Sequence, residues 1–535
     1  MLFYRPSVIV SSIRRRNSSQ ERWNSSGRRL GIGGSKLAQI AKSNGIAQYA
    51  SVIATSIQNN ITTLECGLDA EDVFVSSLQQ ALQYCSDQNN NNSSTSQDDD
   101  TITITSRVGY RTNTKNDETN PTFSKDVTTS EGGIHNISSD YVQHVLETSP
   151  LSQLVTTADN NTNINWTCMI HNPEVQGLEL MQKGASSYDV QDYLQEQLKD
   201  TFHVLDQSDI VTSIGICSNG LSLPSWHPLH LSWKLLLETL PSSSEKPITI
   251  SLPMNLMETQ GISIARQIKQ QNMSSSTKNL VQIYSTRPLT CYPDLGTGTS
   301  PHSFNLVDYS LPLLLPGQNK TVMTNELKSI PMTYNTALNQ ALSHFDATHI
   351  VEKEHPLTTE ERETLEACRL IQSMLHDLDQ MVTNVRSLSA YESHLYSQVI
   401  PLLHESLEEL DETSADVLQQ FFESHGQAIR YTVAQNTRHL LQHHDDDQLL
   451  NLQEQQQPSS LNPNKNDQQE QQRYHLSRHT VPSHQTLQEY ALQYLWEQRT
   501  ENDEDYVIDK VIVGCPRPEY VIEAIQSYDK MKHRK

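Results

Sequence analysis

INWTCMIHNPEVQ, residues 164–176, predicts a buried β-strand that ends in a polar His-Asn-Pro-Glu turn. Trp166, Cys168 and Ile170 fall on one face of such a strand, and His171 stands where it stops. In an α/β barrel, the chemistry collects at the carboxyl ends of the strands. His171 is therefore a candidate site residue, although a histidine in this position is more often structural.

Seven more short β-rich runs recur along the chain, at 28–34, 61–67, 101–110, 211–220, 248–256, 279–289 and 509–515. Helix-compatible segments lie between most of them, including 70–84, 140–154, 189–205, 228–240 and 259–271. The runs are apolar on both faces, as strands covered by helices must be. Eight β-then-α units predict an α/β fold of the (β/α)8 TIM-barrel type. A doubly wound open sheet is the alternative, weakened because no GxGxxG follows the first strand.

A long insertion, 296–480, separates the seventh run from the eighth. Two or three antiparallel helices are expected within about 357–441. The first begins at a capping box formed by Thr358 and Glu361. A heptad seam follows at Cys368, Ile371, Leu375, Leu378, Val382 and Val385. The composition of 443–480 predicts disorder. The barrel then occupies 28–295 and 481–528, with a last helix at 485–498.

The charge balance argues against some partners. With 39 basic and 63 acidic residues, the net charge of -24 disfavours nucleic acid and anionic membranes. No apolar run approaches the ~20 residues that span a bilayer. Seven scattered cysteines without a CxxC suit reduced thiols, and the His-Asp run near 443–447 is better explained as a solvated segment than as a metal site.

The amino terminus predicts an organellar address. Residues 1–29 contain seven Arg, seven Ser and a single acid, Glu21, which is typical of a transit peptide. We expect residues 1–27 to be disordered and removed on import into mitochondria. A chloroplast or cytoplasmic location stays open, because a basic tail has a similar composition.

Five motifs, in this order, resemble the aldo/keto reductases, particularly the branch of galactose- and arabinose-dehydrogenase-like enzymes. They are HNISSDYVQHVLETSPLSQL (135–154), MIHNPEVQ (169–176), GICSNG (215–220), RPL (287–289), and LQEYALQYL (487–495) with VIVGCPRPEYVIEAI (511–525). The resemblance covers roughly 28–295 and 480–528. It implies hydride transfer between NADP, or NAD, and a sugar or other small carbonyl compound.

The resemblance also implies catalytic positions, and the chain departs from most of them. His171 matches the family's histidine, whereas Arg107 stands where the family has lysine and Glu65 where it has aspartate. The family's tyrosine would fall within 68–72, where there is none; Tyr110 lies on a different loop. We expect Glu65, Arg107 and His171 to converge, Glu65 and Arg107 to pair, and His171 to donate the proton.

Cofactor contacts are implied at further positions. The resemblance places the nicotinamide carboxamide against Ser218 and Asn219. Asn255 stands where the family has a glutamine, and Arg287 lies at the end of the seventh strand. Gly514 and Arg517 lie in the loop that binds the adenosine phosphate in the family. No metal is implied.

Two functions remain open. The first is an NADP-dependent oxidoreductase of the aldo/keto reductase type. The second is a catalytically degenerate barrel that binds a nucleotide or a protein partner, with the helices of 357–441 as the docking surface.

Overall fold

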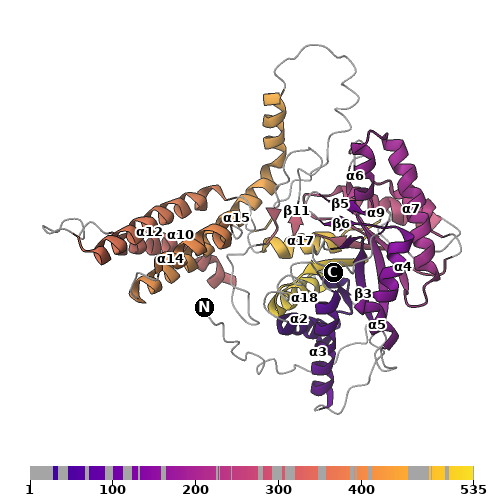
Figure 1. Cartoon of the computed structure of the whole chain (residues 1–535), viewed down its shortest axis with the longest axis horizontal. Coiled ribbons are helices and arrows are strands. Elements are labelled where there is room, and N and C mark those ends of the chain that lie inside the picture. The colour runs from indigo at the N-terminus through magenta and orange to yellow at the C-terminus, as the bar shows by residue number, and fades with distance from the viewer. Residues whose placement is uncertain are drawn as a thin grey trace.

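The computed structural model describes residues 28–33, 46–66, 71–90, 101–111, 123, 125–129, 133–157, 164–223, 227, 229–241, 244–274, 281–291, 304–307, 320–346, 357–385, 391, 394–407, 412–455, 481–482, 485–500 and 505–533. Its centre is a closed, all-parallel barrel in the strand order β1-β13-β10-β9-β8-β7-β3-β2 (Figure 1). The predicted (β/α)8 barrel is thus confirmed, and the open sheet is excluded.

Each of the eight predicted runs contains one barrel strand. The strands are β1 (Leu30–Gly33), β2 (Thr63–Glu65), β3 (Ile102–Val108), β7 (Ile164–His171), β8 (Ser213–Cys217), β9 (Ile248–Pro253), β10 (Val281–Thr286) and β13 (Lys510–Gly514). The barrel closes where β1 pairs with β13, from Leu30 with Val511 to Gly33 with Gly514.

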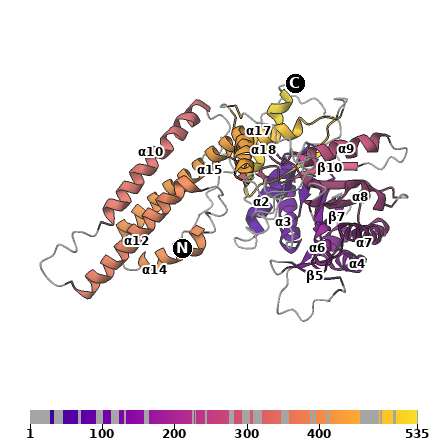
Figure 2. The same ribbon diagram turned by 90° about the horizontal axis from the view of Figure 1, so that it is seen from above.

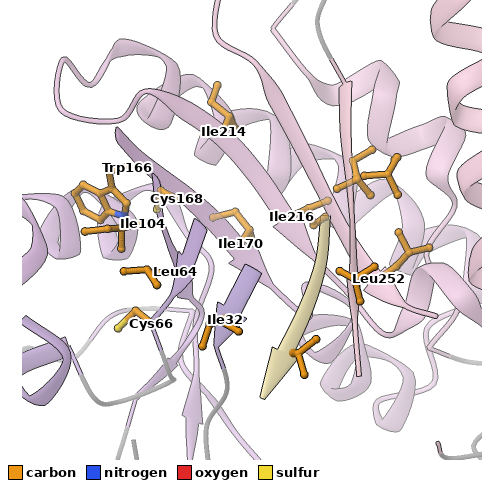
Figure 3. Packing of buried hydrophobic residues seen from close by; sticks show 14 of the residues in the cluster. Ile32, Leu64, Cys66, Ile104, Trp166, Cys168, Ile170, Ile214, Ile216 and Leu252 are labelled. Atoms are coloured by element: carbon orange, nitrogen blue, oxygen red, sulfur yellow. The ribbon is translucent and has the colours of Figure 1, made fainter. Parts of the chain in front are cut away.

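Alternation along the strands separates two environments. Outward side chains such as Leu64, Ile104, Trp166 and Ile216 belong to the main hydrophobic cluster, between the barrel and its helices (Figure 3). Several inward positions carry small polar residues, among them Thr167. Burial of the outward face therefore stabilises the barrel, and the inner face provides polar side chains.

Helices cover the outside of the barrel. They are α2 (Ile46–Gln58), α3 (Glu71–Asn90), α4 (Ser139–Thr148), α5 (Pro150–Thr157), α6 (Glu174–Gln182), α7 (Ser187–Gln207), α8 (Trp233–Thr239), α9 (Gln260–Ser274), α17 (Leu487–Trp496) and α18 (Pro518–His533), with the short 3₁₀ helix η1 (Gly220–Ser222). The segment expected as one helix at 140–154 is two, because the chain turns extended at Ser149 before Pro150.

A small antiparallel sheet follows β3. Its strands are β4 (Tyr110–Arg111), β5 (Val127–Thr128) and β6 (Ile134–His135), in the order β4-β6-β5. Gly109 makes the junction with β3 at a φ of 152°, and a Cβ there would lie 2.9 Å from the carbonyl oxygen of His171. Glycine therefore lets the chain leave the barrel close to the end of β7.

The insertion contains α10 (Lys320–His344), α12 (Thr359–Asn384), the π-helical turn η3 (Leu395–Val399), α14 (Ile400–Leu407) and α15 (Glu412–Gln455), and projects from one side of the barrel (Figures 1 and 2). The capping box of Thr358 and Glu361 is present, and Ile371, Leu375 and Leu378 are buried as the heptad seam predicts. Two short strands, β11 (Thr290–Cys291) and β12 (Phe304–Asn305), connect the barrel to it.

The insertion differs from the prediction at two places. No helix was predicted at α10, whose sequence contains Pro331, yet Ile330, Tyr334 and Leu338 pack in the bundle core. Disorder was expected from 443, but α15 continues to Gln455. The polar run 443–455 has few helix breakers and extends a helix whose earlier turns are packed. Residues 456–480 and the expected transit peptide at 1–27 lie outside the described residues.

Helix α15 joins the bundle to the barrel. Ala434 and Leu441 of α15 share a hydrophobic cluster with Leu256 and Met257, which follow β9, and with Leu487 of α17. The insertion thus packs beside the carboxyl ends of β9 and β10. Within the described residues, no helix is both long and apolar enough to span a bilayer.

Candidate functional site

An ion pair occupies the carboxyl end of β2 and β3. The Nε and Nη2 atoms of Arg107 donate to Oε1 of Glu65 at 3.0 and 2.5 Å. Glu65 is only 3% exposed. Burial would lower the pKa of Arg107, but Cys217 and the Glu65 carboxylate outweigh it, so the pKa lies above its ordinary value. The pairing expected from the sequence is present and holds a permanent cation at this end of the barrel.

Gly33 makes room for this pair. A Cβ at position 33 would lie 2.3 Å from the Cβ of Glu65 and 2.8 Å from its Oε2. Its neighbour across the barrel closure, Gly514, is exposed, and a Cβ there would meet nothing closer than the carbonyl oxygen of Gly33 at 3.4 Å. Gly33 is therefore required by the position of Glu65, whereas Gly514 leaves open space at the end of β13.

His171 lies at the end of β7 and is 7% exposed. Its Nδ1 atom is buried and has no hydrogen-bond partner among the described residues. Burial, then the Arg107 cation and His135, lower the pKa of His171 well below 6.5. His171 is therefore a neutral imidazole at physiological pH. The proton donation expected of His171 requires an imidazolium, which does not fit this environment.

A second histidine and a tyrosine support His171. The ring of Tyr110 packs edge-on against His171, with centroids 5.2 Å apart, and against His135 at 4.6 Å. The Nε2 atom of Gln176 is an amide nitrogen, which can only donate, so it donates to Nδ1 of His135 at 2.9 Å. Nε2 of His135 therefore bears the proton and donates to the carbonyl oxygen of His171 at 2.8 Å. This chain of contacts fixes the end of β7.

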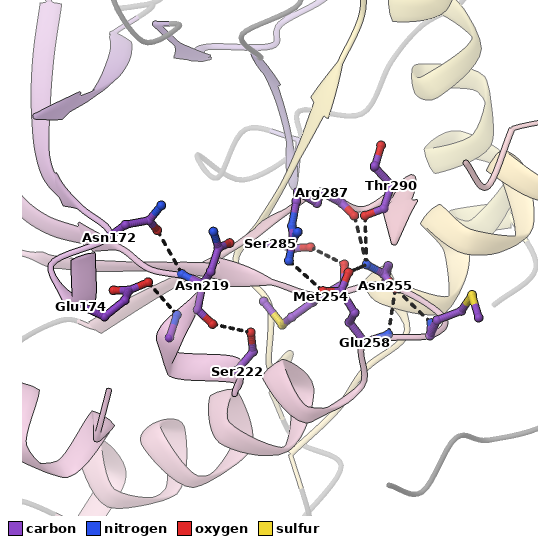
Figure 4. A network of polar contacts seen from close by, with 12 residues as sticks. Asn172, Glu174, Asn219, Ser222, Met254, Asn255, Glu258, Ser285, Arg287 and Thr290 are labelled. Carbon is purple, nitrogen blue, oxygen red and sulfur yellow. Dashed lines mark hydrogen bonds and ion pairs between the residues drawn. The ribbon is translucent and has the colours of Figure 1, made fainter. Parts of the chain in front are cut away.

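The turn after β7 is joined to the turn after β8 (Figure 4). The Glu174 carboxylate accepts from the Ser218 hydroxyl and from the Gly220 amide, both at 2.8 Å. The side chain of Asn172, at a left-handed φ of 46°, accepts from the amide of Asn219 at 3.1 Å. The Ser218 hydroxyl, expected at the carboxamide, is thus committed to the protein, and the Asn219 side chain is half-buried beside it.

Asn255 and Arg287 organise the turns after β9 and β10 (Figure 4). The Asn255 amide nitrogen donates to Glu258 at 2.6 Å and contacts the carbonyls of Arg287 and Thr290 at 3.3 Å. Arg287, at a φ of 52°, pairs with Glu258 at 2.7 Å. Both residues hold the loops on which α15 packs, so their observed roles are structural.

Arg517 stands just before the first turn of α18 and is exposed, close in sequence to Gly514. A helix amino terminus with an arginine and an open glycine is chemically suited to a phosphate group. The phosphate end of a dinucleotide therefore fits these residues. The carboxamide end fits poorly, because Ser218 and Asn255 are already bonded within the protein.

Sequence reasoning brought together Glu65, Arg107 and His171 but missed the support around His171. The position of Tyr110 depends on the turn at Gly109, and that of His135 on a two-residue strand. The short β-rich stretch before Gly109 was visible in the sequence, whereas the pairing of Tyr110 with His135 was not.

No protein-family model matches the sequence, and no curated protein matches it significantly. The fold and the site therefore define a class only, a TIM-type barrel with a buried polar cluster at its carboxyl end. Among the described residues, no group of three or more His, Cys, Asp or Glu side chains is arranged to hold a metal ion.

Proposed function

We propose that this chain is an NADP-dependent oxidoreductase of the aldo/keto reductase type that reduces a sugar or another small carbonyl compound. The observation that supports it most is the Arg107–Glu65 ion pair beside the neutral imidazole of His171 at the carboxyl end of the barrel. The site lies at the end of the barrel where such chemistry is found.

His171, Arg107 and Tyr110 would have different roles, which follow from their charge states. NADPH, when bound, supplies the hydride. Neutral His171 orients the carbonyl group through a hydrogen bond, and Arg107 stabilises negative charge that develops on its oxygen. Arg107 cannot give up a proton, and neutral imidazole is a poor acid. We assign the proton to the phenol of Tyr110, whose ring packs against His171. Tyr110 would replace the tyrosine that is missing from 68–72.

The arrangement of Gly514 and Arg517 supports binding of the cofactor phosphate, with a single arginine favouring NADP over NAD. A direct test is titration of the protein with NADP+ and NAD+ by fluorescence, in the wild type and in Arg517→Ala. Tighter binding of NADP+, reduced at least tenfold by Arg517→Ala, is expected. Equal binding of the two cofactors by both proteins would contradict the assignment.

The second candidate is a degenerate barrel that binds a nucleotide or a protein partner without turnover. The internal hydrogen bonds of Ser218 and Asn255 favour it, because they occupy groups that a nicotinamide carboxamide would need. The two proposals differ in one measurement: cofactor binding with no turnover on any aldose or aldehyde supports the degenerate barrel.

A further inference from the structure

The amino end of the barrel, opposite the candidate site, contains a cavity of about 370 Å³. Its lining includes Thr63 of β2, Thr103 of β3, Asn165 and Thr167 of β7, and Ser213 of β8. These residues lie at or near the beginnings of their strands, whereas Glu65, Arg107 and His171 lie at the ends. The cavity falls within the ~300–1,000 Å³ range of small-molecule sites.

The cavity exists because the strand register brings small polar side chains together. Thr63 is paired with Thr103, Thr103 with Asn165, and Thr167 with Ser213. In barrels of this type, bulky branched side chains usually fill the interior. Threonine, serine and asparagine leave the amino end hollow and line it with groups that can both donate and accept hydrogen bonds.

Several of these groups have unused hydrogen-bonding capacity. The hydroxyls of Thr63, Thr103 and Thr167 and the amide of Asn165 make no hydrogen bond to any residue that the structure describes. None of these atoms is among the buried polar atoms that lack a partner in the described core. Each is therefore accessible, and faces the open space of the cavity. They form a polar surface shared by three adjacent strands.

The two charged side chains that line the cavity, one of each sign, already have partners in the protein. Asp509 pairs with Lys269 at 2.6 Å and accepts from the amide of Ile283 at 2.7 Å. Lys510 donates to the carbonyl oxygen of Arg28 at 2.8 Å. A carboxylate and an ammonium thus stand side by side, each with a partner in the protein. A small anion would meet Asp509, and a small cation would meet Lys510.

We propose that this cavity binds a neutral polyhydroxylated molecule, a monosaccharide or a polyol of similar size. Such a molecule matches the hydroxyl and amide lining, and the buried ring of Tyr284, whose hydroxyl donates to Gln282 at 3.0 Å, adds an aromatic surface. The site is separate from the carboxyl-end site and does not depend on its activity.

The test uses the full-length chain with two probes, methyl α-D-glucopyranoside, which has no free carbonyl, and D-sorbitol. Saturation-transfer NMR and calorimetric titration measure binding to the wild type, Thr103→Val, Thr167→Val, Thr167→Ser and a control, Thr55→Val on the exposed side of α2. We expect each valine variant in the cavity to weaken binding at least tenfold, because valine keeps the shape but removes the hydroxyl. Thr167→Ser and Thr55→Val should bind as the wild type does.

His171→Ala separates this site from the catalytic proposal. Binding of the probes should be unchanged in His171→Ala, even if that variant loses all turnover. Failure of both probes to bind at millimolar concentration would overturn the inference, with water as the only occupant of the cavity. Loss of binding in His171→Ala but not in Thr103→Val would overturn it too, and would place the sugar at the carboxyl end.

Discussion

At the scale of single residues, the candidate site depends on where a few polar groups are buried. Glu65 and Arg107 satisfy each other, whereas Nδ1 of His171 has no hydrogen bond within the described structure. Pairing fixes the charges of Glu65 and Arg107 in place beside the neutral imidazole of His171.

The two glycines at the barrel closure give a matched comparison. Gly33→Ala should displace Glu65 and separate it from Arg107, because the new methyl group would lie 2.3 Å from the Glu65 Cβ. A loss of about 3 kcal/mol in the free energy of unfolding is expected from breaking the pair. Gly514→Ala should change stability by about 1 kcal/mol or less. Urea denaturation of both variants measures this, and equal losses would contradict the packing described for Gly33.

Tyr110→Phe tests the assignment of the proton donor. Phenylalanine keeps the edge-on packing against His171 and His135 but removes the hydroxyl. Turnover should fall roughly 10²-fold or more, the usual contribution of a general acid, while the thermal stability stays close to that of the wild type. Unchanged turnover would exclude Tyr110 as the donor.

Glu174 should make stability depend on pH. Burial raises its pKa to about 7, despite hydrogen bonds from Ser218 and Gly220 that lower it. Between its unfolded pKa of 4.5 and 7, the folded protein therefore holds a proton that the unfolded chain releases, and this contribution to stability falls as pH rises. The wild type should lose about 3 kcal/mol relative to Glu174→Gln between pH 4.5 and 7.5.

Urea unfolding at both pH values measures this difference directly. Comparison with Glu174→Gln is needed because His135 acts in the opposite direction. Burial lowers the pKa of His135 to about 4, so its contribution is lost as pH falls below the unfolded value of 6.5. A pH dependence identical in the wild type and in Glu174→Gln would refute the role of Glu174.

At the scale of elements, the sequence predicted what hydrophobic periodicity controls. All eight barrel strands lie within the predicted runs, and the heptad seam of α12 is buried. Helix α10 was not predicted; it contains Pro331, and packing in the bundle core stabilises it despite this helix-breaking residue. The two-residue strands β4 and β6, which place Tyr110 and His135, are too short for any periodic signal, so the positions of these two residues could not be predicted from the sequence.

Docking of the insertion can be tested at Leu441 of α15, which is buried against the turns after β9 and β10. Leu441→Ala should cost about 2–5 kcal/mol of local stability and increase amide hydrogen exchange around 256–258. Leu402→Ala, at an exposed position of α14, is the matched control and should have little effect. Equal exchange in the two variants would show that α15 does not hold these turns.

At the scale of the whole molecule, the barrel is closed by pairing the first strand with the last. Between β10 and β13 the chain forms a helical bundle and returns to the carboxyl-end loops through α15. Asn255 and Arg287, expected at the cofactor, form hydrogen bonds and an ion pair with Glu258 at that junction. The barrel thus has a polar cluster at one end and a hydroxyl-lined cavity at the other.

We propose that Glu65, Arg107 and His171 form a carbonyl-reducing site. The most direct measurement is NADPH oxidation by the full-length protein with a panel of aldoses and aldehydes, in the wild type and in His171→Ala, beside a fluorescence titration of NADP+. We predict turnover by the wild type, without a step in rate near pH 6.5, because His171 stays neutral there. His171→Ala should bind NADP+ normally and lose turnover. Tight NADP+ binding by the wild type with no turnover on any substrate, or undiminished turnover by His171→Ala, would contradict this role for the three residues.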